Sequence, residues 1–215
     1  MKTDFNTVLN NITEALPKYR RVIFKSFITG LLISSDSGCV AGIYRFVEFL
    51  MFSKGISGKR FYGFLSSGKL PFRAIRKRIL DMLGENILTN GRVLIALDDT
   101  LYGKTGKKIA NCDVHHDHAA KRNSSRFVYG HCRVIAGIQM VIHGRWACLP
   151  LRNSVYRLKK SVDKSRFKTK IEIAGVLIND ILMLFSHPAI IVTDSWFGNR
   201  SLVKELGDKY LSRAH

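Results

Sequence analysis

The chain has 215 residues, 46% of them hydrophobic, with a formal net charge of +19 and a pI near 10.1. This length and apolar content can form one large domain or two small ones, and no apolar run approaches the roughly 18 residues of a membrane span, so we expect no membrane contact. The basic excess extends over both halves of the chain and favours a polyanionic partner.

The cysteines give no sign of a disulfide framework or of a paired metal site. The four of them, Cys39, Cys112, Cys132 and Cys148, form no CxxC pair. The N-terminal residues lack the apolar core of a secretory signal. We therefore expect reduced thiols in a cytoplasmic protein.

Residues 1–88 are predicted to be helical. Asp4 is a suitable N-cap for a first helix whose apolar residues, up to Leu16, follow a helical period, and Pro17 ends or restarts it. The same period predicts four further helices: 22–32, 39–51, a short helix capped by Ser57, and 71–83.

Basic residues interleave with these helices. A small helical bundle with such a surface can bind DNA, for example through a helix-turn-helix, although a solvated polar face is the simpler alternative. We interpret residues 1–88 as a DNA-binding region. Its basic residues include Lys18, Arg20, Arg21, Lys25, Lys54, Lys59, Arg60, Lys69, Arg73, Arg76, Lys77 and Arg78.

Two short apolar runs in the second half end in aspartates. The run 93–97 has the pattern of a strand buried on both faces and is followed by Asp98 and Asp99. A similar run, 189–193, is followed by Asp194. If the two strands are neighbours in one sheet, Asp98 or Asp99 can share a hard cation with Asp194, because such cations prefer oxygen ligands.

The remaining pattern gives the order β-β-β-α-β-α. The elements predicted besides the two strands are a polar loop over 102–126, a hairpin of strands 127–140 and 141–151 with His143-Gly144 as its turn, a basic loop over 152–170, and helices over 169–185 and 199–206. An aspartate on the first strand and another after the fourth resemble the arrangement of an RNase H-like domain.

Several blocks of the sequence resemble DDE transposases from bacterial insertion sequences. The D-D-T-x-x-x-K-x-G block of that family is matched by Asp98-Asp99-Thr100 and the following Lys104, Gly106, Lys107 and Lys108. Similar blocks follow in order: HHDH at 115–118, FVYGHC at 127–132, TDSWFGN at 193–199 and LSR at 211–213. The resemblance covers about residues 20–215 and is specific because the blocks occur in the family's order.

The resemblance implies a fold and a chemistry. The fold is a mixed α/β one, with a helical N-terminal region (1–88) and an RNase H-like sheet domain with flanking helices (89–215). The chemistry is cleavage of DNA at transposon ends and transfer of the freed 3′-OH to target DNA, served by two divalent ions, Mg²⁺ or Mn²⁺.

Within the matched block, the residue roles follow from the family pattern. The pattern places the catalytic acid first, so Asp98 and Asp194 are the expected catalytic and metal-binding residues. Strand alternation sends Asp98 and Asp99 to opposite faces. Asp99 and Thr100 are therefore expected to orient the metal ligands from neighbouring positions without binding the metal themselves.

Residues outside the acidic pair are expected to contact DNA. For the basic loops, the alternative is that their side chains are only solvated. Trp196 is expected to stack on an unpaired base, and the alternative is that it packs in the core. Zinc ligation by Cys112 and the nearby histidines is disfavoured because their spacing is crowded. The expected DNA-binding residues are Lys104, Lys107, Lys108, His118, Lys159, Lys160, Arg166 and Trp196.

The third acid of the family, a glutamate on a later helix, has no counterpart, since Glu205 comes too early after Asp194. We therefore expect a C-terminally truncated domain with an incomplete sheet and impaired transposition. The alternatives are a non-catalytic DNA-binding remnant or inhibitor and, less favoured, another RNase H-like nuclease. The resemblance also implies a bacterial, nucleoid-associated cytoplasmic protein that binds DNA and pairs with itself or with a full-length transposase.

Overall fold

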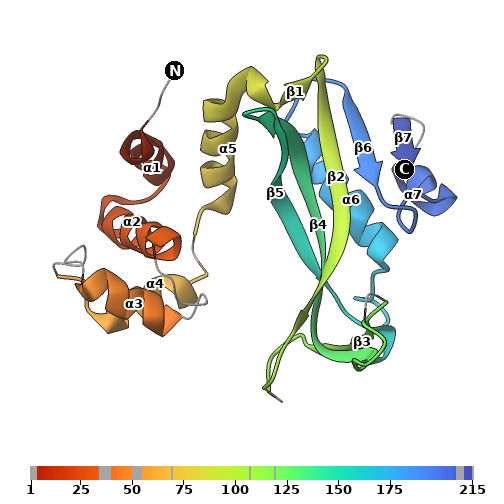
Figure 1. Ribbon diagram of the computed structural model, residues 1–215, viewed down its shortest axis with the longest axis horizontal. Coiled ribbons are helices and arrows are strands. Elements are labelled where there is room, and N and C mark those ends of the chain that lie inside the picture. Colours follow the sequence, from red (N-terminus) through yellow and green to blue (C-terminus); the bar gives the residue numbers. More distant parts are fainter. Residues whose placement is uncertain are drawn as a thin grey trace. The chain divides into compact units, whose positions relative to one another are not determined.

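The computed structural model describes residues 4–33, 40–49, 55–68, 70–106, 108–118, 120–206 and 211–214, the last four as backbone only. The chain divides into two units, Met1–Leu83 and Gly84–His215. Figure 1 shows a helical first unit and a second unit built on a sheet. The boundary predicted at 88/89 lies within the short strand β1 (Leu88–Thr89).

The first unit contains the helices α1 (Phe5–Thr13), α2 (Lys18–Ile33), α3 (Val40–Phe49), α4 (Gly58–Ser66) and α5 (Phe72–Leu83). Asp4 caps α1 by accepting a hydrogen bond from the Thr7 N–H at 3.0 Å, and Ser57 accepts one from the Arg60 N–H at 3.4 Å. Such caps satisfy N–H groups that have no partner within the helix. The predicted break at 34–38 and the basic residues Lys54 and Lys69 lie outside the described residues.

Helix α2 begins earlier than its apolar period predicts. It starts at Lys18 and not near Val22, because Pro17 opens the helix rather than interrupting it. The Arg20 N–H donates to the Pro17 carbonyl at 2.8 Å. Proline suits a helix start, where its missing N–H would have no partner within the helix.

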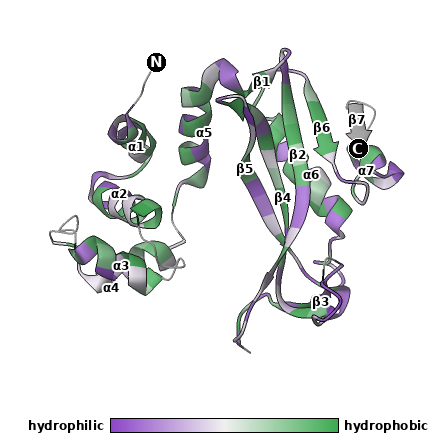
Figure 2. Cartoon of the chain, in the orientation of Figure 1, coloured by the Kyte–Doolittle hydropathy of each residue, from purple (hydrophilic) through white to green (hydrophobic). Residues whose placement is uncertain are grey.

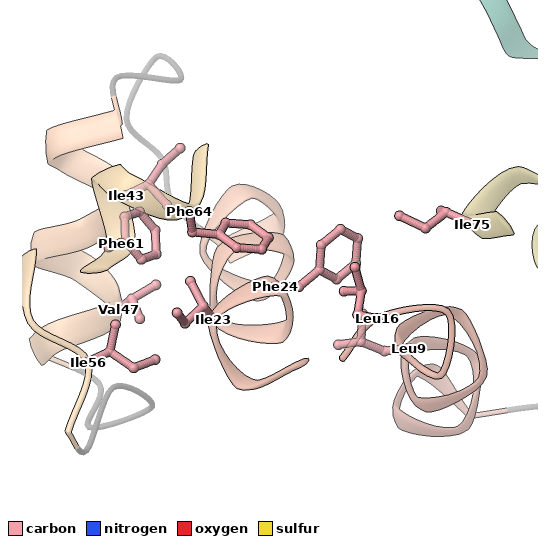
Figure 3. Packing of buried hydrophobic residues seen from close by; sticks show 10 residues of the cluster. All are labelled: Leu9, Leu16, Ile23, Phe24, Ile43, Val47, Ile56, Phe61, Phe64 and Ile75. Carbon is pink, nitrogen blue, oxygen red and sulfur yellow. The ribbon is translucent and has the colours of Figure 1, made fainter. Parts of the chain in front are cut away.

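The helices of the first unit pack around one apolar core (Figure 3). Phe61 is completely buried, and its ring lies 5.9 Å from that of Phe27 and 5.3 Å from that of Tyr44. Gly30 lets α2 approach α3 closely, since a Cβ there would lie 2.6 Å from Val47 Cγ2. The core residues drawn are Leu9, Leu16, Ile23, Phe24, Ile43, Val47, Ile56, Phe61, Phe64 and Ile75.

The second unit is organised around a mixed sheet, which confirms the predicted α/β architecture. Within the described residues the sheet has seven strands: β1, β2 (Arg92–Gly103), β3 (Asp113–His116), β4 (Phe127–Ile142), β5 (Arg145–Tyr156), β6 (Ala189–Thr193) and β7 (Leu211–Ala214). The order along the sheet is β3-β4-β2-β6-β7, with β5 also paired to β4 and β1 to β2. β6 is parallel to β2 and to β7, and the other pairs are antiparallel.

Three predicted boundaries in this unit are wrong. β2 does not end at Leu97 but continues to Gly103, because β4 supplies a hydrogen-bonding partner along its whole length. The predicted loop over 102–126 contains β3, which pairs with the first residues of β4. β5 extends to Tyr156, so the basic loop is shorter than predicted. The turn at His143-Gly144 is as predicted, and both residues have the positive φ of a tight hairpin, 50° and 76°.

Helix α6 (Lys170–Leu182) covers β4 and β5, and α7 (Arg200–Leu206) packs beside α6. Figure 2 shows the apolar residues of β2, β4 and β6 in the sheet. The unit also has two single-turn 3₁₀ helices, η1 (Gly84–Ile87) and η2 (Lys159–Ser161). Among the helices of the described ranges, none has the length and apolar character needed to cross a membrane.

Candidate functional site

The register between β2 and β6 brings Asp98 and Asp194 to neighbouring strands. The two strands run parallel, and Leu97 opposite Thr193 is their last pair. Asp98 and Asp194 are the next residue on each strand. Parallel strands have their carboxyl ends on the same side of the sheet, so Asp98 and Asp194 occupy equivalent positions just after the last paired residues.

Asp98 is an exposed carboxylate with acidic neighbours. Its Oδ1 accepts a hydrogen bond from the Asp99 N–H at 2.7 Å, and no described residue forms an ion pair with it. Partial burial raises the pKa of Asp98, the hydrogen bond from Asp99 opposes this rise, and the charges of Asp99 and Asp194 add to it. A cation at this position would therefore relieve repulsion between carboxylates.

Asp99 points to the opposite face of β2, as alternation requires. Val93, Ile95 and Leu97 are buried on that face. There Lys170, the first residue of α6, forms an ion pair with Asp99 Oδ2. The Cys132 thiol also donates to Asp99 Oδ2 at 3.4 Å. Burial raises the pKa of Cys132 to about 11, so the thiol keeps its proton and can donate.

The ammonium group of Lys170 lies between two aromatic rings. The centre of the Trp196 ring is 5.1 Å from Nζ, and that of the Tyr156 ring is 5.5 Å away. Burial lowers the pKa of Lys170, but the hydrogen bond and charge of Asp99 outweigh burial and raise it overall. Lys170 therefore stays charged at neutral pH, where cation–π contacts add to the ion pair.

The segment TDSWFGN forms a tight turn between β6 and α7. The Phe197 N–H donates to Asp194 Oδ1 at 3.1 Å, and the Gly198 N–H donates to the Asp194 carbonyl at 2.9 Å. Phe197 is completely buried, whereas the neighbouring Trp196 is 51% exposed. Asn199 Oδ1 accepts from the N–H groups of the first residues of α7 and so caps that helix. The turn fixes Asp194 through the residues that follow it.

A cavity of about 900 Å³ opens on the α6 face of the sheet. It brings together five predicted site residues, Asp99, Thr100, His118, Asp194 and Trp196. The lining residues are Asp99, Thr100, Leu101, His115, His116, Asp117, His118, Cys132, Tyr156, Leu158, Thr169, Lys170, Ile171, Asp194 and Trp196.

The other predicted site residues are not part of that lining. Asp98 lies on the far face of β2, next to the cavity's Asp99. The predicted phosphate contacts Lys104, Lys108, Lys159, Lys160 and Arg166 are exposed, and Lys107 lies outside the described residues.

Lys170 and Tyr156 were missed as members of the site. The predicted basic loop over 152–170 and the predicted helix over 169–185 overlap at Lys170, which is the first residue of α6. Thr169 and Glu172 form a capping box, in which the Glu172 N–H donates to Thr169 Oγ1 at 3.2 Å and the Thr169 N–H donates to Glu172 Oε2 at 2.7 Å. The pattern Thr-x-x-Glu before an apolar run signals such a helix start, but no local pattern indicates the ion pair of Lys170 with Asp99.

The histidines of residues 115–118 line the cavity, but their side chains do not form a group of metal ligands within the described residues. Alternation along β3 buries His115 and exposes His116. The His116 ring lies 4.5 Å from that of His118. Burial lowers the pKa of His115, which favours its neutral form. Within the described ranges, no group of three or more His, Cys, Asp or Glu side chains could hold a metal ion.

A buried ion pair anchors the basic segment after β5. Asp113 is only 7% exposed and accepts hydrogen bonds from Arg157 Nε at 2.8 Å and from the Leu158 N–H at 3.1 Å. Arg157 also donates to Asn111 Oδ1 and to the Ser161 carbonyl. Arg157 therefore holds the turn that presents Lys159 and Lys160.

Replacing Asp113 with asparagine should lower the free energy of unfolding by about 2 kcal/mol at pH 7, because charged hydrogen bonds to a buried group are removed. Burial raises the pKa of Asp113, but its hydrogen bonds from Arg157, Ser161 and Leu158 lower it overall. A lowered folded-state pKa gives stability that is complete above the unfolded pKa of about 3.9 and is lost as the pH falls through the folded value.

Urea denaturation should therefore show the same difference in the free energy of unfolding between wild type and Asp113→Asn at pH 7 and at pH 5. This difference should become smaller below about pH 4. The exposed Asp163, replaced with asparagine, serves as the control. If the difference in the free energy of unfolding between wild type and Asp113→Asn stays constant until both proteins unfold in acid, the Asp113 carboxylate is not the source of this stability.

Comparison with known proteins places almost the whole chain within one family model. A family described as DDE superfamily endonuclease matches residues 11–214. No curated protein matches the chain.

Proposed function

The chain belongs to the DDE superfamily of endonucleases, and from this premise we propose that it cleaves DNA at the ends of a transposable element and joins the freed 3′-OH to target DNA. Asp98 and Asp194 are the proposed catalytic carboxylates. Enzymes of this superfamily act on DNA and generally use divalent metal ions.

One observation carries the proposal. The parallel register of β2 and β6 ends at Leu97 and Thr193, so Asp98 and Asp194 follow on adjacent strands. Residues far apart in sequence are thereby brought to adjacent strands, and the charge of Asp194 contributes to the raised pKa of Asp98. Asp98 supports this role better than Asp99, whose charge is already balanced by Lys170.

The donor set fits a hard divalent cation. Mg²⁺ takes oxygen ligands, keeps several waters, and is commonly bound by one or two carboxylates together with substrate phosphates. Asp98 and Asp194 supply such carboxylates, and Asp99 and Thr100 lie directly beside Asp98. When bound, a pair of Mg²⁺ or Mn²⁺ ions would stabilise the attacking and leaving oxygens at the phosphorus.

The residues of this chain would orient the reacting groups. The Asp99 N–H fixes one oxygen of Asp98, and the Phe197 N–H fixes one oxygen of Asp194. Each carboxylate keeps its other oxygen for a ligand. Water or a 3′-OH would then attack the phosphorus directly, the bond from phosphorus to the 3′-oxygen of the cut strand would break, and that oxygen would leave as the 3′-OH; no covalent intermediate with the protein is required.

The proposed DNA contacts in the second unit are the exposed basic residues after β5, and residues 1–88 are proposed separately as a DNA-binding region. Lys159 and Lys160 lie on η2, which Arg157 and Asp113 anchor. Arg166 is exposed in the same loop, Lys104 and Lys108 are exposed after β2, and His118 lines the cavity. Trp196, with half of its surface exposed, can stack on an unpaired base.

Replacing Lys159 and Lys160 together with glutamine should reduce the salt dependence of DNA binding. Each lysine that binds a phosphate contributes about 0.9 to the slope of log K against log salt concentration. We expect a slope that is less steep by about 2, measured by fluorescence anisotropy with labelled duplex. Lys204→Gln on α7 is the matched control, and an unchanged slope in the double variant would exclude both lysines as phosphate ligands.

A nicking assay tests the proposal. The purified chain is incubated with DNA carrying the terminal inverted repeats of the element, in Mg²⁺, in Mn²⁺ or in excess EDTA. We expect nicking at the repeat ends with either metal and none in EDTA. DNA binding that persists without nicking in any metal would contradict catalysis by this chain.

DNA binding without cleavage is the second candidate. Glu205, the only glutamate after Asp194, packs over Gly175 of α6, where an added Cβ would lie 2.5 Å from its Cγ. It does not line the cavity. In this case the chain would occupy transposon ends, alone or together with a catalytically active transposase, and impede transposition.

A further inference from the structure

Lys170 joins three parts of the second unit that are distant in sequence. Its ammonium group forms an ion pair with Asp99 on β2 and lies 5.1 Å from the ring of Trp196, in the turn after β6. It also lies 5.5 Å from the ring of Tyr156, the last residue of β5. Only 22% of the Lys170 side chain and 29% of the Asp99 side chain are exposed, so the pair is shielded from most of the solvent.

Two of the contacts of Lys170 lie close in sequence to the two carboxylates proposed as catalytic. On β2, the residue bound by Lys170 is Asp99, whose N–H donates to Asp98 Oδ1. In the turn, the Trp196 carbonyl accepts from Asn199 Nδ2 at 2.7 Å, and the next N–H, that of Phe197, donates to Asp194 Oδ1. The ammonium group thus contacts a side chain next to Asp98 and a side chain two residues from Asp194.

We propose that Lys170 is a positioning residue that holds the turn carrying Asp194 against the strand carrying Asp98, an inference that rests on the proposed function. The start of α6 is rigid because Thr169 and Glu172 cap it reciprocally. A cation at that start attracts the Asp99 carboxylate and the faces of both rings. The distance between Asp98 and Asp194 is therefore set partly by a residue that need not contact metal or DNA.

The competing role for Lys170 is a direct contact with a DNA phosphate from the cavity wall. The two roles predict different kinetics. A phosphate contact strengthens DNA binding, so its removal raises KM for DNA. A positioning residue acts on the geometry of the carboxylates, so its removal weakens metal binding and lowers kcat while leaving KM unchanged.

Lys170→Met removes the charge while keeping a chain of similar length. We expect the Kd for Mn²⁺, measured by electron paramagnetic resonance, to rise about tenfold, which corresponds to about 1.4 kcal/mol. We also expect kcat for nicking to fall about tenfold and KM for DNA to stay within about twofold. Lys170→Arg keeps the charge and the ring contacts and should stay near wild type, and Lys204→Met is the control.

A rise in KM for Lys170→Met with unchanged Mn²⁺ affinity and kcat would overturn the inference in favour of a phosphate contact. Wild-type values of all three quantities would overturn it as well. If Lys170→Met fails to fold because Asp99 is left unpaired, the double variant Asp99→Asn/Lys170→Met removes both charges. The same decrease in Mn²⁺ affinity is then expected in the double variant, and wild-type affinity there would overturn the inference.

Fluorescence tests the contact with the turn separately from activity. Trp146 and Trp196 are the two tryptophans, and Trp146→Phe leaves Trp196 as the reporter. In that background Lys170→Met should shift the emission of Trp196 and increase its quenching by acrylamide, and an unchanged spectrum would overturn the inference. A wild-type chain that neither binds Mn²⁺ nor nicks DNA, but keeps this fluorescence response, would instead contradict the proposed function and leave the contact standing.

Discussion

Replacing Asp98 or Asp194 with asparagine is expected to reduce metal-dependent nicking of end DNA at least about 1,000-fold, or roughly 4 kcal/mol in activation free energy. Asparagine has nearly the same shape as aspartate and can still accept the hydrogen bond that each carboxylate receives. The reduction would therefore come from the missing charge, which a divalent cation needs for binding and which no neighbouring group replaces.

Three measurements make this result specific. DNA binding, followed by anisotropy, should remain within about threefold of wild type, because neither residue is a basic contact. Glu205→Gln should nick normally, since Glu205 packs on α6 away from the cavity. Asp99→Asn distinguishes the two adjacent acids: abolished nicking in this variant together with normal nicking by Asp98→Asn would transfer the ligand role to Asp99.

Replacing Phe197 with alanine is expected to lower the free energy of unfolding by about 4 kcal/mol. Phe197 is completely buried, with its ring 4.7 Å from that of Trp196. Truncation removes the transfer free energy of the ring and leaves a cavity that rigid neighbours fill only in part. The turn that holds Asp194 should loosen with it, so nicking should fall even where the protein remains folded.

Urea denaturation followed by circular dichroism measures this effect. Phe197→Leu keeps most of the buried volume and should cost less than about 2 kcal/mol. Trp196→Ala, at a half-exposed position in the same turn, is the surface control and should change stability by less than Phe197→Ala. Equal effects of Phe197→Ala and Trp196→Ala would show that Phe197 is not the anchor of the turn.

Local signals in the sequence were sufficient for much of the fold. Asp4 and Ser57 indicated helix starts because their side chains can cap free N–H groups, and both do so. His143-Gly144 indicated a two-residue turn, and the apolar run before Asp194 indicated a strand. Each of these features depends on neighbours within a few residues, which the sequence displays directly.

The features that could not be predicted from the sequence depend on pairing between distant segments. β2 runs past Asp98 and Asp99 because β4 pairs with it as far as Gly103, although the two aspartates end its apolar run. β3 forms within a polar segment for the same reason. The ion pair between Asp99 and Lys170 joins residues whose proximity follows only from the packing of α6 on the sheet.

The parallel pairing of β2 with β6 also has a consequence for the order in which the second unit folds. The β4–β5 hairpin joins consecutive strands through a two-residue turn and can form early. Pairing β2 with β6 instead closes a segment of roughly 100 residues, which carries a larger cost in chain entropy. We therefore expect Asp98 and Asp194 to reach neighbouring positions late in folding, after the β4–β5 hairpin and α6 have formed. During synthesis, β6 and the turn that follows it must leave the ribosome before the two carboxylates can face each other.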